Sequence, residues 1–132
     1  MYNIFLRNLA VFCTSALFLF AQDVTLTLVP GNPSEIHYES TSDIYGFQFS
    51  HNGCIESASG GDAVAAGLSI SATSSTVLAF SFSGAAITPE TFNGSGTLVE
   101  FTGDVTIDCI TNVTVAGVPP SELAAVLNAS EP

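Results

Sequence analysis

Two stretches of the chain place a large apolar residue at every second position, which is the spacing of side chains on one face of a β-strand. In "STVLAFSFSG" (75–84) these residues are Leu78, Phe80 and Phe82, and in "DIYGFQFS" (43–50) they are Tyr45, Phe47 and Phe49. We expect both faces to lie in the core between two layers of antiparallel strands. The alternative is a surface position, where the rings would form an aromatic platform for carbohydrate.

Further segments alternate in the same way, and turn residues separate them. They are "DVTLTLVP", "SEIHYES", "LSISA", "TLVEFTG" and "DVTIDCITNVTVAG", with Gly, Pro and Asn between them. Many short strands without long helices predict an all-β fold, an antiparallel two-sheet β-sandwich over residues 22–117. The last segment, "SELAAVLNA", combines a possible N-cap at Ser121 with good helix formers, so a short helix or linker is expected within a tail at 118–132.

Residues 1–21 have the organisation of a secretory signal peptide. Arg7 precedes the apolar run "NLAVFCTSALFLFA", which ends at Ala21. The alternative is a retained anchor, although the run is short for a bilayer span. The sequence therefore predicts a secreted, extracellular domain that has no membrane contact once the leader is removed.

The remaining chain is strongly acidic. Residues 22–132 contain all twelve Asp and Glu residues and neither Lys nor Arg. A surface of this kind repels phosphate, which argues against nucleic acid and anionic membranes as partners.

Two cysteines follow the leader, Cys54 and Cys109. An even pair in an exported chain favours a disulfide. Closing a loop of this length is worth on the order of 4 kcal/mol by chain entropy. The alternative is two free, separately buried thiols.

Reactive constellations are few, and no catalytic residue is predicted. His51 and Cys54 are close in sequence, but a turn histidine and a disulfide cysteine explain them more simply than a nucleophile with its base. His37 shares a strand face with Glu35 and Glu39, a trio that suits either a metal or an exposed edge.

No cofactor is predicted; calcium is the alternative that the acidic surface leaves open, because hard cations bind several oxygen ligands. Asp62, Asp104 and Asp108 lie near glycines, but they form no recognisable calcium loop, and no ligand set is assigned. A small hydrolase with paired carboxylates is a weaker alternative. Three N-x-S/T triplets begin at Asn93, Asn112 and Asn128, and each is a potential glycosylation site in a eukaryotic secretory pathway.

Four motifs occur in an order that resembles cohesin-like domains of marine microbial type, which are extracellular modules related in fold to carbohydrate-binding β-sandwiches. The motifs are "DIYGFQF" (43–49), "GGDA" (60–63), "TVLAFSFSG" (76–84) and "GSGTLVEF" (94–101). The resemblance implies a jelly-roll sandwich that works in adhesion or surface assembly without catalysis. Cohesins hold a dockerin partner through one face of a sheet, but the resemblance assigns no contact residue here.

We therefore expect a secreted, non-enzymatic recognition, adhesion or scaffold module that acts through protein–protein contacts or self-association. A carbohydrate-binding module is the main alternative, with an extracellular polysaccharide in place of a protein as the partner.

Overall fold

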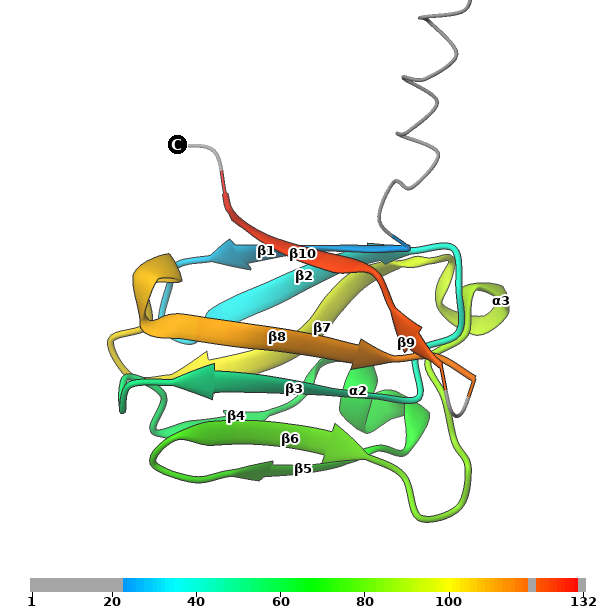
Figure 1. The fold of residues 1–132 in the computed structure, drawn as a ribbon, viewed down its shortest axis with the longest axis horizontal. Coiled ribbons are helices and arrows are strands. Elements are labelled where there is room, and N and C mark those ends of the chain that lie inside the picture. The colour runs from blue at the N-terminus through cyan, green and yellow to red at the C-terminus, as the bar shows by residue number, and fades with distance from the viewer. Residues whose placement is uncertain (1–22, 119–120, 131–132) are drawn as a thin grey trace, which may run out of the picture.

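The protein is a sandwich of two five-stranded β-sheets, as predicted from the alternating segments (Figure 1). The computed structural model describes residues 23–118 and 121–130. The first sheet has the strand order β10-β1-β2-β7-β4, and the second has the order β5-β6-β3-β8-β9. All pairs of neighbouring strands are antiparallel except β1 and β10, which run parallel.

The elements follow the chain in the order β1 (Val24–Val29), β2 (Ser34–Ser40), β3 (Gly46–His51), β4 (Ser57–Ser59), α2 (Gly61–Ala66), β5 (Ser69–Ala72), β6 (Thr76–Phe80), α3 (Pro89–Phe92), β7 (Ser95–Thr102), the 3₁₀ turn η2 (Ile107–Cys109), β8 (Ile110–Ala116), β9 (Glu122–Leu123) and β10 (Ala125–Ala129). Among the described residues, the α-helices α2 and α3 are short and lie beside the sheets (Figure 1).

The core forms where the inward side chains of the two sheets meet. On β1, Val24, Leu26 and Leu28 are buried, as their alternation with threonines predicted. On β3, the rings of Phe47 and Phe49 are also buried. The ring of Phe49 meets Phe101 of the opposite sheet edge-on, with centroids 5.9 Å apart. Stacked apolar faces of this kind supply the main free energy of folding for a sandwich.

The predicted orientation of β6 is wrong. Val77 and Ala79 point into the core, whereas Leu78 and Phe80 lie on the outer side, and Phe82 is 86% exposed just beyond the strand. Alternation specifies that two faces differ, but it does not specify which of them is buried. On β6, the smaller Val77 and Ala79 side chains are buried in the core between the two sheets, and the larger Leu78 and Phe80 face outward.

The prediction of a helix or linker near the C-terminus is also wrong. Residues 122–123 form β9 and residues 125–129 form β10, so the sandwich continues to the end of the described chain. β10 pairs in parallel with β1, and Ala125 lies opposite Val24. The ladder hydrogen bonds offered by β1 outweigh the local helix preference of Ala and Leu, which is a weak determinant by itself. The predicted signal peptide at 1–21 lies outside the described residues.

The predicted disulfide is present and joins Cys54 to Cys109. It ties the loop after β3 to the 3₁₀ turn before β8. Since β3 and β8 are paired neighbours, the bridge fastens one end of the second sheet.

Candidate functional site

The outer side of the second sheet carries an exposed Leu on β6, and an exposed Phe follows directly after that strand. We call the surface formed by Tyr45, Gln48, Leu78, Phe80, Phe82 and Thr114 the aromatic face. Of these, Phe82 is 86% and Leu78 is 38% exposed, while Tyr45 and Phe80 are half-buried. Scattered exposed apolar residues are normal on proteins, whereas a contiguous patch indicates a contact surface.

The strand register brings the side chains of this face together in two rows across the sheet. The first row runs Ser69, Phe80, Gly46 and Ala116. The second row runs Ser71, Leu78, Gln48 and Thr114. Residues directly opposite one another on neighbouring strands have their Cβ atoms about 5 Å apart, so the members of each row are neighbours across the sheet, with a gap in the first row where Gly46 has no side chain.

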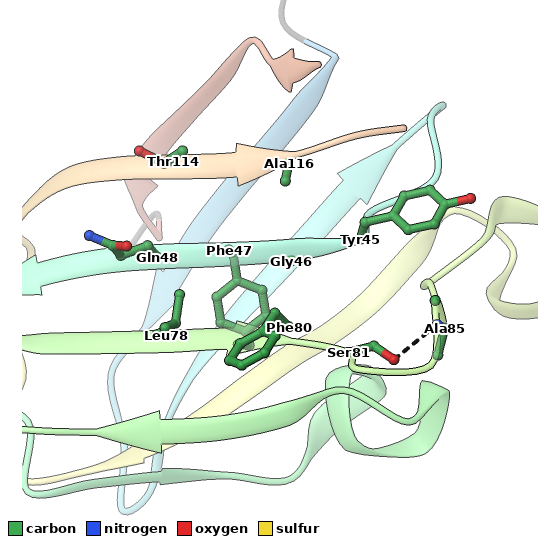
Figure 2. A pocket seen from close by; sticks show the side chains of 12 residues that line it. Tyr45, Gly46, Phe47, Gln48, Leu78, Phe80, Ser81, Ala85, Thr114 and Ala116 are labelled. Atoms are coloured by element: carbon green, nitrogen blue, oxygen red, sulfur yellow. Dashed lines mark hydrogen bonds between the residues drawn. The ribbon is translucent and has the colours of Figure 1, made fainter. Parts of the chain in front are cut away.

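An open groove of about 460 Å³ lies along these rows, between Tyr45 at one end and Leu78 at the other (Figure 2). Gly46 forms its floor. A Cβ atom at Gly46 would lie 2.7 Å from the carbonyl oxygen of Ala79, so this position needs glycine for β3 and β6 to approach each other. The groove therefore has a side-chain-free floor between Phe80 and Ala116.

The loop after β6 borders the groove and is held by local hydrogen bonds. The Ser81 hydroxyl accepts hydrogen bonds from the backbone N–H groups of Ser83 and Ala85, at 3.0 Å each. Figure 2 shows the contact between Ser81 and Ala85 at the side of the groove facing Tyr45. This loop also carries Phe82, whose ring lies 4.7 Å from that of Phe80 at an angle of 67°. The exposed ring of Phe82 thus stands at an angle to the half-buried ring of Phe80, and the two do not form one flat plane.

The sequence predicted that the rings of Tyr45, Phe80 and Phe82 lie in the core. It did not predict Gln48 or Thr114 as residues of a site. Both follow from alternation once the inner faces are known. Gln48 separates the buried Phe47 and Phe49, and Thr114 precedes the buried Val115. A polar residue between two core aromatics is the signal that marks the outer side of β3.

A cluster of polar side chains lies on the other side of the molecule from the aromatic face, on the outer side of the first sheet. His37 Nε2 is 2.6 Å from Glu35 Oε1, and the Thr97 hydroxyl donates to the same oxygen at 3.2 Å. The hydrogen bond from His37 is the main reason that the pKa of Glu35 lies below its ordinary value. Partial burial opposes this shift, and the Thr97 hydroxyl adds to it.

Glu39, the third member of the predicted trio, lines the same polar groove of about 570 Å³ as His37. Within residues 23–118 and 121–130, no group of three or more His, Cys, Asp or Glu side chains is arranged to hold a metal ion. Asp62 is engaged internally, where it accepts a hydrogen bond of 2.7 Å from the hydroxyl of the buried Tyr38. Asp104 and Asp108 are exposed.

His51 and Cys54 do not form a nucleophile and base, because Cys54 is held in the disulfide. His51 is buried and its Nδ1 accepts a hydrogen bond from the Gly53 N–H at 3.0 Å. Its Nε2 lies 3.0 Å from the Thr73 carbonyl oxygen and acts as the donor to it. His51 therefore links the turn after β3 to the β5–β6 hairpin, which is a structural role. Among the potential glycosylation sites, Asn93, Asn112 and Asn128 are all exposed.

Comparisons with protein-family models, with curated proteins and with solved structures found no match. Over the described part of the chain, no helix combines the length and apolarity needed to cross a bilayer.

Proposed function

We propose that this protein is an extracellular, non-enzymatic recognition module that binds another protein through the aromatic face. The observation that carries the proposal is the exposed ring of Phe82, which packs against the half-buried ring of Phe80 beside an apolar groove. Burying a large apolar side chain of this kind in a partner contributes about 1.5–3 kcal/mol. Leaving it in water serves no purpose in folding.

The shape of the face favours a protein partner. Binding energy in protein interfaces is concentrated in a few large side chains that enter pockets of the partner, with weaker contacts around them. Phe82 projects as such an anchor, and the groove next to it receives a side chain in return. Gln48 and Thr114 supply hydrogen-bonding groups in the adjacent row.

An extracellular location is supported by the disulfide between Cys54 and Cys109, because such bonds persist in oxidising compartments. The leader predicted at residues 1–21 agrees with this location. Adhesion and scaffolding are the roles that suit a small sandwich module with an exposed apolar contact face, and the resemblance to cohesin-like domains points the same way.

The experiment is a binding assay with the immobilised protein and the extracellular protein fraction of its own organism. We expect saturable binding that protease treatment of that fraction abolishes. Phe82→Ser removes the projecting ring and should weaken the affinity by about tenfold or more.

Val64→Ser provides the matched control. Val64 is 51% exposed, but it lies on α2, which packs mainly against β7 of the first sheet, and it does not line the groove. Binding by Val64→Ser should equal that of the unchanged protein. Equal binding by Phe82→Ser would refute a role for the aromatic face.

Carbohydrate binding is a second candidate, and the same exposed rings support it. Sugar rings stack on aromatic side chains, and Gln48, Ser81 and Thr114 offer hydrogen bonds beside them. The angle of 67° between Phe80 and Phe82 suits a flat polysaccharide surface less well than coplanar rings would. Protease-resistant binding to purified neutral polysaccharides, lost in Phe82→Ser, would favour this candidate over a protein partner.

A further inference from the structure

We infer that the partner of the aromatic face presents aliphatic or aromatic side chains flanked by Lys or Arg. This inference rests on the proposed function and adds the chemistry of the partner. It combines the apolar centre of the face with the charges at its margin.

The centre of the face is uncharged. The groove is lined by apolar, hydroxyl, amide and glycine residues, and it includes no carboxylate and no cationic group. Burying this surface therefore needs no desolvation of an ionised side chain. The attraction at the centre is the burial of apolar area, anchored by Phe80, Phe82 and Leu78.

The margin of the face carries carboxylates. Glu122 on β9 lies directly opposite Ala116, which ends the first row of the face, and it is exposed. Two strand spacings, or about 10 Å, separate it from Gly46 at the floor of the groove. Asp43 precedes Tyr45 by two residues, and the Tyr45 N–H bonds to the Ala116 carbonyl oxygen at 2.8 Å.

Within residues 23–118 and 121–130, no cationic side chain pairs with these carboxylates. Residues 22–132 contain neither Lys nor Arg. In the part of the chain that the structure describes, the contact between His37 and Glu35 is the single pairing of a carboxylate with a potentially cationic side chain. A cationic partner would therefore meet acidic groups that have no competing internal partner.

Charge also separates the possible occupants of the groove. A second copy would bring the same excess of carboxylates and would be repelled at low salt, whereas a Lys- or Arg-rimmed partner would be attracted. A neutral glycan carries no charge for the acidic margin to attract. Electrostatic complementarity of this kind raises the association rate and selects the partner, while the apolar contact sets the lifetime of the complex.

The test uses synthetic peptides as probes, because the chain contains no Trp and a single peptide Trp reports its own burial. Two amphipathic helical peptides share one apolar stripe that contains the Trp, and their polar positions are all Lys in one and all Glu in the other. A third peptide has the composition of the Lys peptide in shuffled order, so that it has no apolar stripe. Each is titrated with the full chain while the Trp emission is recorded.

We expect the Lys peptide to bind with a blue shift of its Trp emission, and the Glu and shuffled peptides to bind at least about tenfold more weakly. Phe82→Ser should raise the dissociation constant of the Lys peptide by about tenfold or more. Glu122→Gln should raise it about two- to fivefold, and Val64→Ser should leave it unchanged. High salt should weaken binding by the unchanged protein.

The outcomes separate this inference from the proposed function. Equal, Phe82-dependent binding of the Lys and Glu peptides overturns the cationic partner but leaves the aromatic face as a docking site. Binding of the Lys peptide that is the same in Phe82→Ser and in the unchanged protein overturns both, because charge alone would explain it. No detectable binding of the Lys peptide, or concentration-dependent dimers of the chain that block it, also overturns the inference.

Discussion

The pKa of the Tyr38 hydroxyl is set by its burial and by its contact with Asp62. The ring of Tyr38 is buried, and its hydroxyl donates to Asp62. Burial first, and then the hydrogen bond and the charge of Asp62, raise the pKa of Tyr38 above its ordinary value. The neutral phenol is therefore the form that fits the folded protein.

Removal of this hydroxyl tests the contact. Tyr38→Phe should lower the free energy of unfolding at neutral pH by about 1 kcal/mol, the typical net value of one hydrogen bond. The raised pKa adds stability that is present below the ordinary tyrosine pKa of about 10 and is lost as the pH rises above it. Urea unfolding from neutral to alkaline pH should thus show a shallower alkaline decline in Tyr38→Phe. Identical declines would contradict the buried contact.

Glu35 provides the opposite case, because His37 lowers its pKa. The resulting stability is present above the ordinary glutamate pKa of about 4.3 and is lost as the pH falls through the lower value of the folded state. His37→Ala should raise the pKa of Glu35, as followed by NMR titration of its carboxyl carbon.

Thr27 lies directly opposite His37 on the neighbouring strand, so Thr27→Val is a suitable control for this titration. The pKa of Glu35 should stay low in Thr27→Val. A pKa that is equally low in His37→Ala would show that the contact does not form in solution.

At the scale of elements, β6 and the loop after it offer one buried and one exposed side chain for comparison, Val77 and Phe82. Val77→Ala should cost about 1–3 kcal/mol of unfolding free energy, because it leaves a cavity in the core between the two sheets. Phe82→Ser should change the stability by no more than about 0.5 kcal/mol, since its ring is in water. Chemical denaturation of both variants measures the difference, and the reverse order would place Phe82 in the core.

The same strand shows which parts of the structure were predictable from the sequence. Alternation predicted β1, β2, β3 and the β5–β6 hairpin, because a period of two residues is a local property of the chain. The inward face of β6 depends on what lies above and below the strand, so the larger side chains of Leu78 and Phe80 suggested the wrong side. β10 was missed because its strand conformation depends on pairing with β1, which lies about a hundred residues away.

Only part of the candidate site could be predicted from the sequence. Phe80 and Phe82 were named as a surface platform only in the alternative interpretation, and Phe82 is the residue that projects most. The line from Phe80 through Gly46 to Ala116 joins three strands, and it appears only once their register is known. The contact of Glu35 with His37, in contrast, follows from their two-residue spacing on one strand.

At the scale of the whole molecule, the disulfide is the main covalent constraint on the unfolded chain. The two cysteines are 55 residues apart, and removing the bridge should lower the free energy of unfolding by about 4 kcal/mol. Urea unfolding of Cys54→Ser/Cys109→Ser beside the unchanged protein measures this cost. A loss well below about 1 kcal/mol would contradict a stabilising role for the bridge.

The two outer sides of the sandwich differ in chemistry. The claim that a ligand docks on the aromatic face can therefore be tested by finding which side the ligand contacts. The aromatic face is apolar and lies on the second sheet, whereas Glu35, His37 and Glu39 mark the polar outer side of the first sheet. A cationic ligand attracted by charge alone would spread over the carboxylates, and a ligand anchored by the rings would not.

The most direct measurement is therefore an NMR titration of the ¹⁵N-labelled chain with the amphipathic Lys peptide. Docking on the aromatic face predicts that the largest shifts fall on backbone amides of β3, β6 and β8, centred on Gly46, Phe80 and Ala116. Shifts concentrated on β1, β2 and β7 instead, around His37 and Glu39, would contradict it.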